Sequence, residues 1–205
     1  MAVSTTSISN MALARIGATR INDYAEDANV QAIQCRLCYE PDRDALLRSH
    51  WWPFAGSRVE LAQNATDPDF EYDYAYDLPS DYIALRTIWD AIYTGGRLPY
   101  SCALEGTQIL SDESSLYIRY TKKITDPTKF DPLFVQVLKT RMALDMLYPL
   151  CKTAAVAAGD RLQQELDKLM LQVKVMDRAE QNLIRPRRTW LQARRSNVCA
   201  DPSHM

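Results

Sequence analysis

The sequence lacks the features by which secreted and membrane proteins are usually recognised. No stretch approaches the roughly 18 uncharged apolar residues of a membrane span, and residues 1–7 contain neither a basic nor an apolar segment typical of a signal peptide. We therefore expect an intracellular protein, or one released without secretion, and no membrane partner. With 205 residues, 47% of them hydrophobic, the chain is long enough to bury a proper core.

Cysteine is too scarce and too scattered for a disulfide framework or a metal centre. The five cysteines are odd in number, and a chain of this length does not need crosslinks. Cys35 and Cys38 have the spacing of a redox or zinc pair, but no second pair follows to complete four zinc ligands. Because residues three apart share one face of a helix, we interpret both as small core residues. We expect no metal and no cofactor.

Catalytic motifs are missing as well. Neither of the glycine-rich patterns that cradle phosphates, GxGxxG and GxxxxGK[ST], occurs in the chain. His50 and His204 are the only histidines, and neither belongs to a recognisable triad, so His50 is interpreted as a helix-end residue. Acidic residues alternate over residues 67–73, without the central glycine and final glutamate of a calcium loop. The protein is therefore predicted not to be an enzyme.

Four helical segments are predicted from apolar periodicity and capping residues. They cover about residues 7–17, 27–50, 131–150 and 153–184. We expect Ser7 to cap the first helix, Gly17 to close it, and Asp131 followed by Pro132 to begin the third. Pro41 lies inside the second segment and favours two nearly collinear helical pieces.

The last of these helices carries a narrow apolar stripe, which is typical of packing against an antiparallel neighbour. The stripe consists of Leu162, Leu166, Leu169, Val173, Met176 and Leu183.

A β-rich insertion of about residues 83–121 separates the N-terminal from the C-terminal helices. Short strands are predicted at residues 83–93, 98–104, 107–110 and 116–120. They would form a small antiparallel meander that needs the helices for stability, while residues 62–82 are interpreted as a loop. The predicted fold class is therefore mainly α, within α+β: a helical bundle with an inserted meander and an extended C-terminal arm.

A run of aromatic residues follows the second helical segment. Trp51, Trp52 and Phe54 lie close together beside a proline that stops the helix. We interpret these rings as core residues that lock the helical body onto the β region, which is entered through Leu78 and Pro79.

Charge is unevenly distributed, although the net charge is only −2. Residues 1–100 have an excess of acid, and residues 185–205 form a basic arm that contains one tryptophan and one leucine. The arm could contact the phosphates of nucleic acid, dock on a protein partner with its apolar residues as anchors, or act as a disordered solubilising end. The candidate binding residues are Arg185, Arg187, Arg188, Trp190, Leu191, Arg194 and Arg195.

Taken in order, these elements resemble the tail tubular protein A family of bacteriophages, the head-to-tail adaptors of short-tailed phages. The matching motifs lie within about the first 90 residues. They are the helix at residues 10–17, the aromatic run at 51–55 with residues 58–62 after it, and a Tyr-x-Leu-Pro-x-Asp segment at 76–81. The helices near residues 131–184 and the arm are similar to the family in layout only.

The resemblance implies a structural virion protein at the head-to-tail junction, assembled in the host cytoplasm. Members of the family form a ring, usually twelve-fold, beneath the portal protein. The ring connects the portal to a tail nozzle, tail tube or terminator protein and lets DNA pass without sequence-specific binding. On this basis residues 1–184 form a single adaptor domain, and residues 185–205 form an arm that reaches the portal. The residues placed in that extension are Arg187, Arg188, Trp190 and Leu191.

Two other functions remain open from the residues alone. The first alternative is a DNA-associated packaging or regulatory protein that binds through its arginine-rich C-terminal tail. The second is a small hydrolase that acts through the acidic residues between Asp67 and Asp81.

Overall fold

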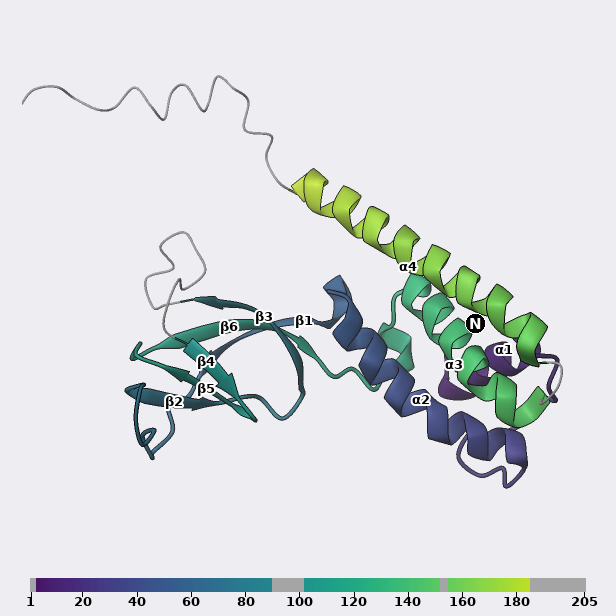
Figure 1. Ribbon diagram of the computed structural model, residues 1–205, viewed down its shortest axis with the longest axis horizontal. Helices are drawn as coiled ribbons and strands as arrows, with labels where there is room; N and C mark the ends of the chain where they lie inside the picture. Colours follow the sequence, from purple (N-terminus) through teal and green to yellow (C-terminus); the bar gives the residue numbers. More distant parts are fainter. Residues whose placement is uncertain (1–2, 90–101, 152–154, 185–205) are drawn as a thin grey trace, which may run out of the picture.

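The computed structural model places a helical body beside a smaller β region (Figure 1). The structure describes residues 3–89, 102–151 and 155–184. Within these ranges four helices form the body: α1 (Thr5–Arg15), α2 (Val30–Ser49), α3 (Pro132–Cys151) and α4 (Ala155–Ile184). Helix α3 packs against each of the other three, and one cluster of buried side chains joins all four. The predicted helices are thus confirmed to within about one turn at each end.

Three residues mark the two ends of α1 and the start of α3. Ser4 is the N-cap of α1, and its Oγ accepts the backbone N–H of Ser7 at 3.1 Å. The prediction that Ser7 caps this helix was therefore wrong, because the earlier serine adds a turn of backbone hydrogen bonds. Gly17 closes α1 with a φ of 71°, as predicted. Asp131 begins α3, also as predicted, since its Oδ1 accepts the N–H of Leu133 at 2.7 Å.

Helix α2 is continuous through Pro41, so the prediction of two helical pieces was wrong. Pro41 cannot donate to the carbonyl of Leu37, but both residues lie on the exposed face, where that carbonyl can be hydrated. The opposite face buries Cys35, Tyr39 and Leu46 against the helical core. This packing offsets the cost of about 3 kcal/mol for a proline inside a helix.

Helix α4 runs beside α3 and extends beyond it (Figure 1), because its 30 residues span about 45 Å against about 30 Å for α3. Leu162 and Val173 are buried as predicted. Met176 is 53% exposed, against the prediction, because the inward position one residue later belongs to Asp177. Among the described residues, no helix has the length and apolar content needed to cross a membrane.

The β region consists of two three-stranded antiparallel sheets, with strand orders β1-β6-β3 and β2-β5-β4. The strands are β1 (Gly56–Leu61), β2 (Tyr74–Asp77), β3 (Tyr82–Trp89), β4 (Cys102–Glu105), β5 (Gln108–Ser111) and β6 (Leu116–Lys122). The sheets share a core that is separate from the helical one. Its buried members are Leu61, Tyr76, Ile109, Leu116, Ile118 and Tyr120.

Two predictions about this region were wrong. The described strands begin at Gly56 rather than near residue 83, and the segment interpreted as a loop contains β2. The strands also do not form a meander, because β6 pairs with β1 and β3 instead of with β5. Strand β6 buries Leu116, Ile118 and Tyr120, and a neighbour on each side satisfies its backbone groups. The long-range partner β1 supplies one of these neighbours.

The attachment of β3 to α2 depends on the guanidinium of Arg86. The β3–β6 register shifts between Tyr82 and Ala84 and again between Leu85 and Thr87. These shifts mark bulges, which change the direction of the side chains there. Nη2 of Arg86 donates to the carbonyl of His50 at 2.7 Å and also to the carbonyls of Leu47 and Arg48. Its Nε donates to Thr121 Oγ1 at 2.7 Å. A positive charge thus caps the negative end of α2 and fixes it to the sheet.

The aromatic run contacts both the helical core and the β region. Trp52 is 2% exposed and its Nε1 donates to the carbonyl of Leu46 at 3.0 Å. The rings of Trp52 and Phe134 lie edge-on, with centroids 5.0 Å apart. The centroid of Phe54 lies 5.2 Å from that of Phe134. Trp51 instead lies beneath the guanidinium of Arg119 in β6, at 5.5 Å. The rings therefore join body and β region as predicted, but the chain enters that region at β1 rather than through Leu78 and Pro79.

Replacing Arg86 by alanine is expected to lower the free energy of unfolding by about 2–3 kcal/mol, because several half-buried acceptors lose a charged donor. Arg86→Lys should recover only part of this loss, since an ammonium group cannot form the same fork. Urea unfolding measures the effect. The exposed Arg161→Ala is the control and should change stability by less than about 0.5 kcal/mol. Equal effects of Arg86→Ala and Arg161→Ala would contradict the capping role.

Candidate functional site

The predicted binding residues of the C-terminal arm lie outside the described residues. They are Arg185, Arg187, Arg188, Trp190, Leu191, Arg194 and Arg195. Helix α4 ends at Ile184, where the arm was predicted to begin. Within the described ranges, the candidate sites are motifs and surfaces of the body and β region.

The cysteine pair lies on the inner side of α2, as its spacing predicted. Cys35 is fully buried with its Sγ 3.6 Å from the sulfur of Met146, and Cys38 is half-buried. Burial raises the pKa of both thiols, that of Cys38 to about 11 with a further contribution from Asp42. Both thiols are therefore protonated at neutral pH. Across residues 3–89, 102–151 and 155–184, no group of three or more His, Cys, Asp or Glu side chains could hold a metal ion.

His50 ties the long helix α4 to the end of α2. It occupies the C-cap position of α2, as a helix-end residue should, and its Nε2 contacts the Oδ2 of Asp177. Its ring also lies edge-on to Trp52, with centroids 5.3 Å apart. Both partners of the His50–Asp177 contact are largely buried. The contact therefore holds together α2, the aromatic core and the far part of α4.

A buried carboxyl group, Asp42, lies between α2 and α3. Its side chain is 4% exposed, and its Oδ1 accepts the Nε of Arg141 at 3.0 Å. Burial, followed by the neighbouring carboxylate of Asp145, raises the pKa of Asp42 to about 7, and Arg141 only partly opposes this. The neighbouring Asp44 behaves oppositely: burial acts against its ionisation, but Arg43 and Lys123 outweigh that effect and lower its pKa.

The outer face of α2 carries an apolar stripe, hereafter the α2 stripe. Val30, Ile33 and Leu37 are 60%, 42% and 63% exposed, and their spacing of three and four places them on one helix face. Going along the helix, the same face continues into Glu40 and Asp44. The α2 stripe therefore ends beside the exposed carboxylate of Glu40, whereas Asp44 is already paired with Arg43 and Lys123.

A second apolar stripe, hereafter the α4 stripe, lies on the outer face of α4. Leu171 and Val175 are 63% and 58% exposed, and Lys168 and Arg178 flank them at helical spacing on the same face. Helix α3 separates the two stripes, and α2 and α4 lie on opposite sides of the body (Figure 1). One side thus presents apolar surface beside Glu40, and the other presents apolar surface flanked by Lys168 and Arg178.

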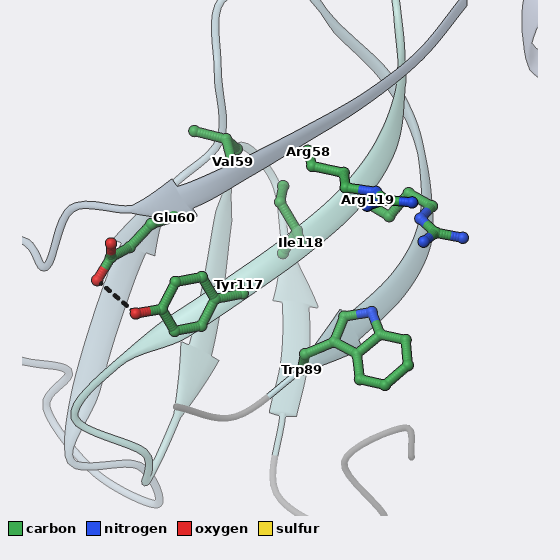
Figure 2. A pocket seen from close by; sticks show the side chains of 7 residues that line it. All are labelled: Arg58, Val59, Glu60, Trp89, Tyr117, Ile118 and Arg119. Atoms are coloured by element: carbon green, nitrogen blue, oxygen red, sulfur yellow. Dashed lines mark hydrogen bonds between the residues drawn. The ribbon is translucent and has the colours of Figure 1, made fainter. Parts of the chain in front are cut away.

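The β1-β6-β3 sheet carries a hollow of about 440 Å³, hereafter the sheet hollow. Figure 2 shows Arg58 and Arg119 close together at one end, Tyr117 beside Glu60 at the other, and Trp89 below the arginines. The phenol of Tyr117 donates to Glu60 Oε1 at 3.0 Å and holds that carboxylate at the far end. The hollow therefore has a cationic end, an acidic end and aromatic walls.

Two arginines occupy directly opposed positions in this sheet. Arg58 and Arg119 are register partners of β1 and β6, and like charges placed opposite each other destabilise a sheet. Burial, and then the charge of Arg58, lowers the pKa of Arg119, whose Nε is buried without a hydrogen-bond partner. The Trp51 ring under the guanidinium of Arg119 offsets part of this repulsion, and an anionic group placed between the two guanidiniums would relieve it further.

The sequence did not predict any of these three surfaces. The apolar spacing of α2 contains the signal for its stripe, but the same spacing also describes a buried face. The sheet hollow could not be found, because β1 was not predicted to be a strand. An alternation of polar with apolar residues from Arg58 to Leu61 was the available signal.

A scan against protein-family models finds no match to this chain, and a search of curated proteins finds no relative. The resemblance to the tail tubular protein A family therefore stays a prediction.

Asp42 makes stability depend on pH in a defined direction. The folded protein keeps a proton on Asp42 up to about pH 7, whereas the unfolded chain releases it near pH 4. This contribution to stability is complete below about pH 4 and is lost as the pH rises through about 7. Asp42→Asn should therefore raise the free energy of unfolding at pH 8 by about 1–3 kcal/mol, and change it much less at pH 5.

Urea unfolding at both pH values measures the effect. Asp44→Asn is the matched control: it removes a carboxylate with a lowered pKa, so it should destabilise the protein at pH 8. An Asp42→Asn variant that is less stable than the parent protein at pH 8 would overturn this account of the buried carboxyl group.

Proposed function

We propose that this protein is a structural component of a phage virion, a head-to-tail adaptor that forms a ring under the portal and connects it to the tail. Copies associate through the helical body, the C-terminal arm contacts the portal, and DNA passes through the ring without sequence-specific binding. A tail nozzle, tube or terminator protein binds on the other side. The protein acts in this proposal by assembly and has no catalytic role.

The observation that carries the proposal is the pair of exposed stripes on opposite sides of the body. Exposed leucine, isoleucine and valine side chains each gain about 1.5–3 kcal/mol when fully buried. The exposed carboxylate of Glu40 beside the α2 stripe is opposite in charge to Lys168 and Arg178 beside the α4 stripe, so the two faces can pair with each other. A contact between unlike faces is heterologous, and repetition of such a contact closes a ring when the rotation permits.

The order of motifs along the chain supports the phage context. The Tyr-x-Leu-Pro-x-Asp segment, which contributes to the resemblance, has an architectural role in the described structure. The N–H of Leu78 donates to the carbonyl of Thr107 at 2.9 Å, and Asp81 accepts the phenol of Tyr120 at 2.9 Å. A motif that shapes the β region is consistent with a scaffold whose function is to present surfaces.

Polar substitution of either stripe should prevent assembly without unfolding the subunit. Leu37→Gln and Leu171→Gln each alter a side chain that is 63% exposed, so each should shift stability by less than about 0.5 kcal/mol. Each should abolish the ring on the cognate portal, because every contact of a ring uses both stripes. Sedimentation of the adaptor–portal complex measures the number of copies bound.

Leu104→Gln is the control for these variants. Leu104 is 50% exposed in the β region, away from both stripes, and its substitution should leave assembly unchanged. Failure of the parent chain to associate with a portal at all would sink the adaptor proposal. Full assembly of the Leu37→Gln variant would show that the α2 stripe is not the contact.

Deleting residues 185–205 separates the adaptor from the DNA-binding alternative. We expect the shortened chain to lose portal binding, because the arm supplies that contact, and to show no specific loss of DNA retention. A protein that binds phosphates through several arginines should instead lose DNA retention on this deletion, and should show steep salt dependence beforehand. Filter retention of duplex DNA at increasing salt, run beside portal co-sedimentation, distinguishes the two outcomes.

A further inference from the structure

Among the described residues, the β region carries two exposed features of opposite charge. One is the sheet hollow, with the opposed Arg58 and Arg119. The other is the loop between β1 and β2, whose residues 67–73 are hereafter the acidic tip. Phe70 at its centre is 79% exposed, and no other large hydrophobic side chain in the described ranges is more exposed. Each feature costs the isolated subunit free energy.

The backbone of the acidic tip holds Phe70 outward. Glu71 has a φ of 74°, which side chains other than glycine adopt rarely. The N–H of Tyr72 donates to the carbonyl of Phe70 at 3.0 Å, which closes a γ-turn around Glu71. Strained turns of this kind persist where the surrounding structure enforces them, and they cluster at binding sites. Asp69 and Glu71 directly precede and follow Phe70 in the sequence.

We propose that the sheet hollow of one copy receives the acidic tip of a neighbouring copy, with Phe70 as the anchor and its flanking carboxylates on Arg58 and Arg119. The inference rests on the proposed function in one respect, since a ring is what brings neighbouring copies side by side. It adds a second contact, in the β region, to the one between the helical stripes.

The chemistry of the two surfaces is complementary. Arginine forms its strongest hydrogen bonds with carboxylates, often through two parallel bonds. The phenylalanine ring can pack edge-to-face with Trp89 and accept a guanidinium over its face. A hollow of about 440 Å³ is large enough for one aromatic side chain and its neighbours. The tip carries Asp67, Asp69, Glu71 and Asp73.

The observations favour a second copy over the other occupants of such a site. Because Phe70 is largely exposed, the tip does not occupy the hollow of its own chain. A nucleic-acid strand running across the hollow would meet the carboxylate of Glu60, which Tyr117 holds in place. An acidic tip can bind at the arginine end alone, without reaching Glu60. The hollow and the tip are two different surfaces of one chain, as are the two stripes. A contact between them is therefore heterologous.

The test uses the full chain with a photoreactive side chain at the tip. Phe70→p-benzoylphenylalanine in unlabelled protein is mixed at high concentration and low salt with ¹⁵N-labelled parent protein, irradiated, and digested for mass spectrometry. We expect cross-links of mixed isotope composition that map to β1, β6 and Trp89. The matched control is Leu104→p-benzoylphenylalanine, which lies on the other sheet and should not cross-link to the hollow.

Charge reversal identifies the contact. Arg58→Glu in the labelled copy, a change at an exposed side chain, should reduce the mixed cross-links by roughly tenfold, because it places like charges together. Combining it with Glu71→Arg in the photoreactive copy should restore much of the yield. Cross-links confined to one copy, or a yield indifferent to Arg58→Glu, would overturn the inference. An added oligonucleotide could abolish the mixed cross-links and itself cross-link to Trp89. That result would overturn the inference in favour of nucleic acid as the occupant of the hollow.

The same irradiation on the portal-bound assembly separates this inference from the proposed function. A ring that forms without a tip-to-hollow cross-link contradicts the inference and leaves the adaptor function intact. A tip-to-hollow cross-link in a protein that never binds a portal supports the contact and contradicts the adaptor function.

Discussion

The arrangement of this protein depends on one guanidinium, that of Arg86, at the end of helix α2. At a bulge of β3, this side chain donates both to Thr121 of the sheet and to three carbonyls at the end of α2. The reciprocal bond from Arg48 to the carbonyl of Ile83, at 2.7 Å, fixes the same joint from the helix side. The helical core and the sheet core are separate clusters of buried side chains. These hydrogen bonds hold the two in one orientation.

That fixed orientation is what an assembly subunit requires. The α2 and α4 stripes lie on opposite sides of the body, while the sheet hollow and acidic tip lie in the β region. Contacts in both parts can form together only if the joint between the parts is stiff. The His50–Asp177 contact contributes to this stiffness, because it holds α4 to the same helix end that Arg86 caps. In the proposed ring, polar groups at the end of one helix therefore set the geometry between copies.

Local signals predicted the helices well, and long-range pairing decided what could not be predicted. Asp131 and Gly17 have capping roles set by their own backbone, so sequence alone was sufficient. Strand β1 was missed because its partner, β6, lies far along the chain. The exposure of the α2 stripe could not be predicted either. The apolar spacing of α2 fits a buried face, yet Leu37 is 63% exposed. The predicted arm residues lie outside the described ranges, and no prediction located the sheet hollow.

In the proposed ring, unlike faces of one chain join neighbouring copies around a channel. An electron cryo-microscopy reconstruction of the full chain bound to its cognate portal tests this most directly. The account predicts a closed ring in which the α2 stripe of each copy lies against the α4 stripe of the next. Copies bound to the portal singly, or a ring in which Leu37 and Leu171 both face solvent, would contradict it.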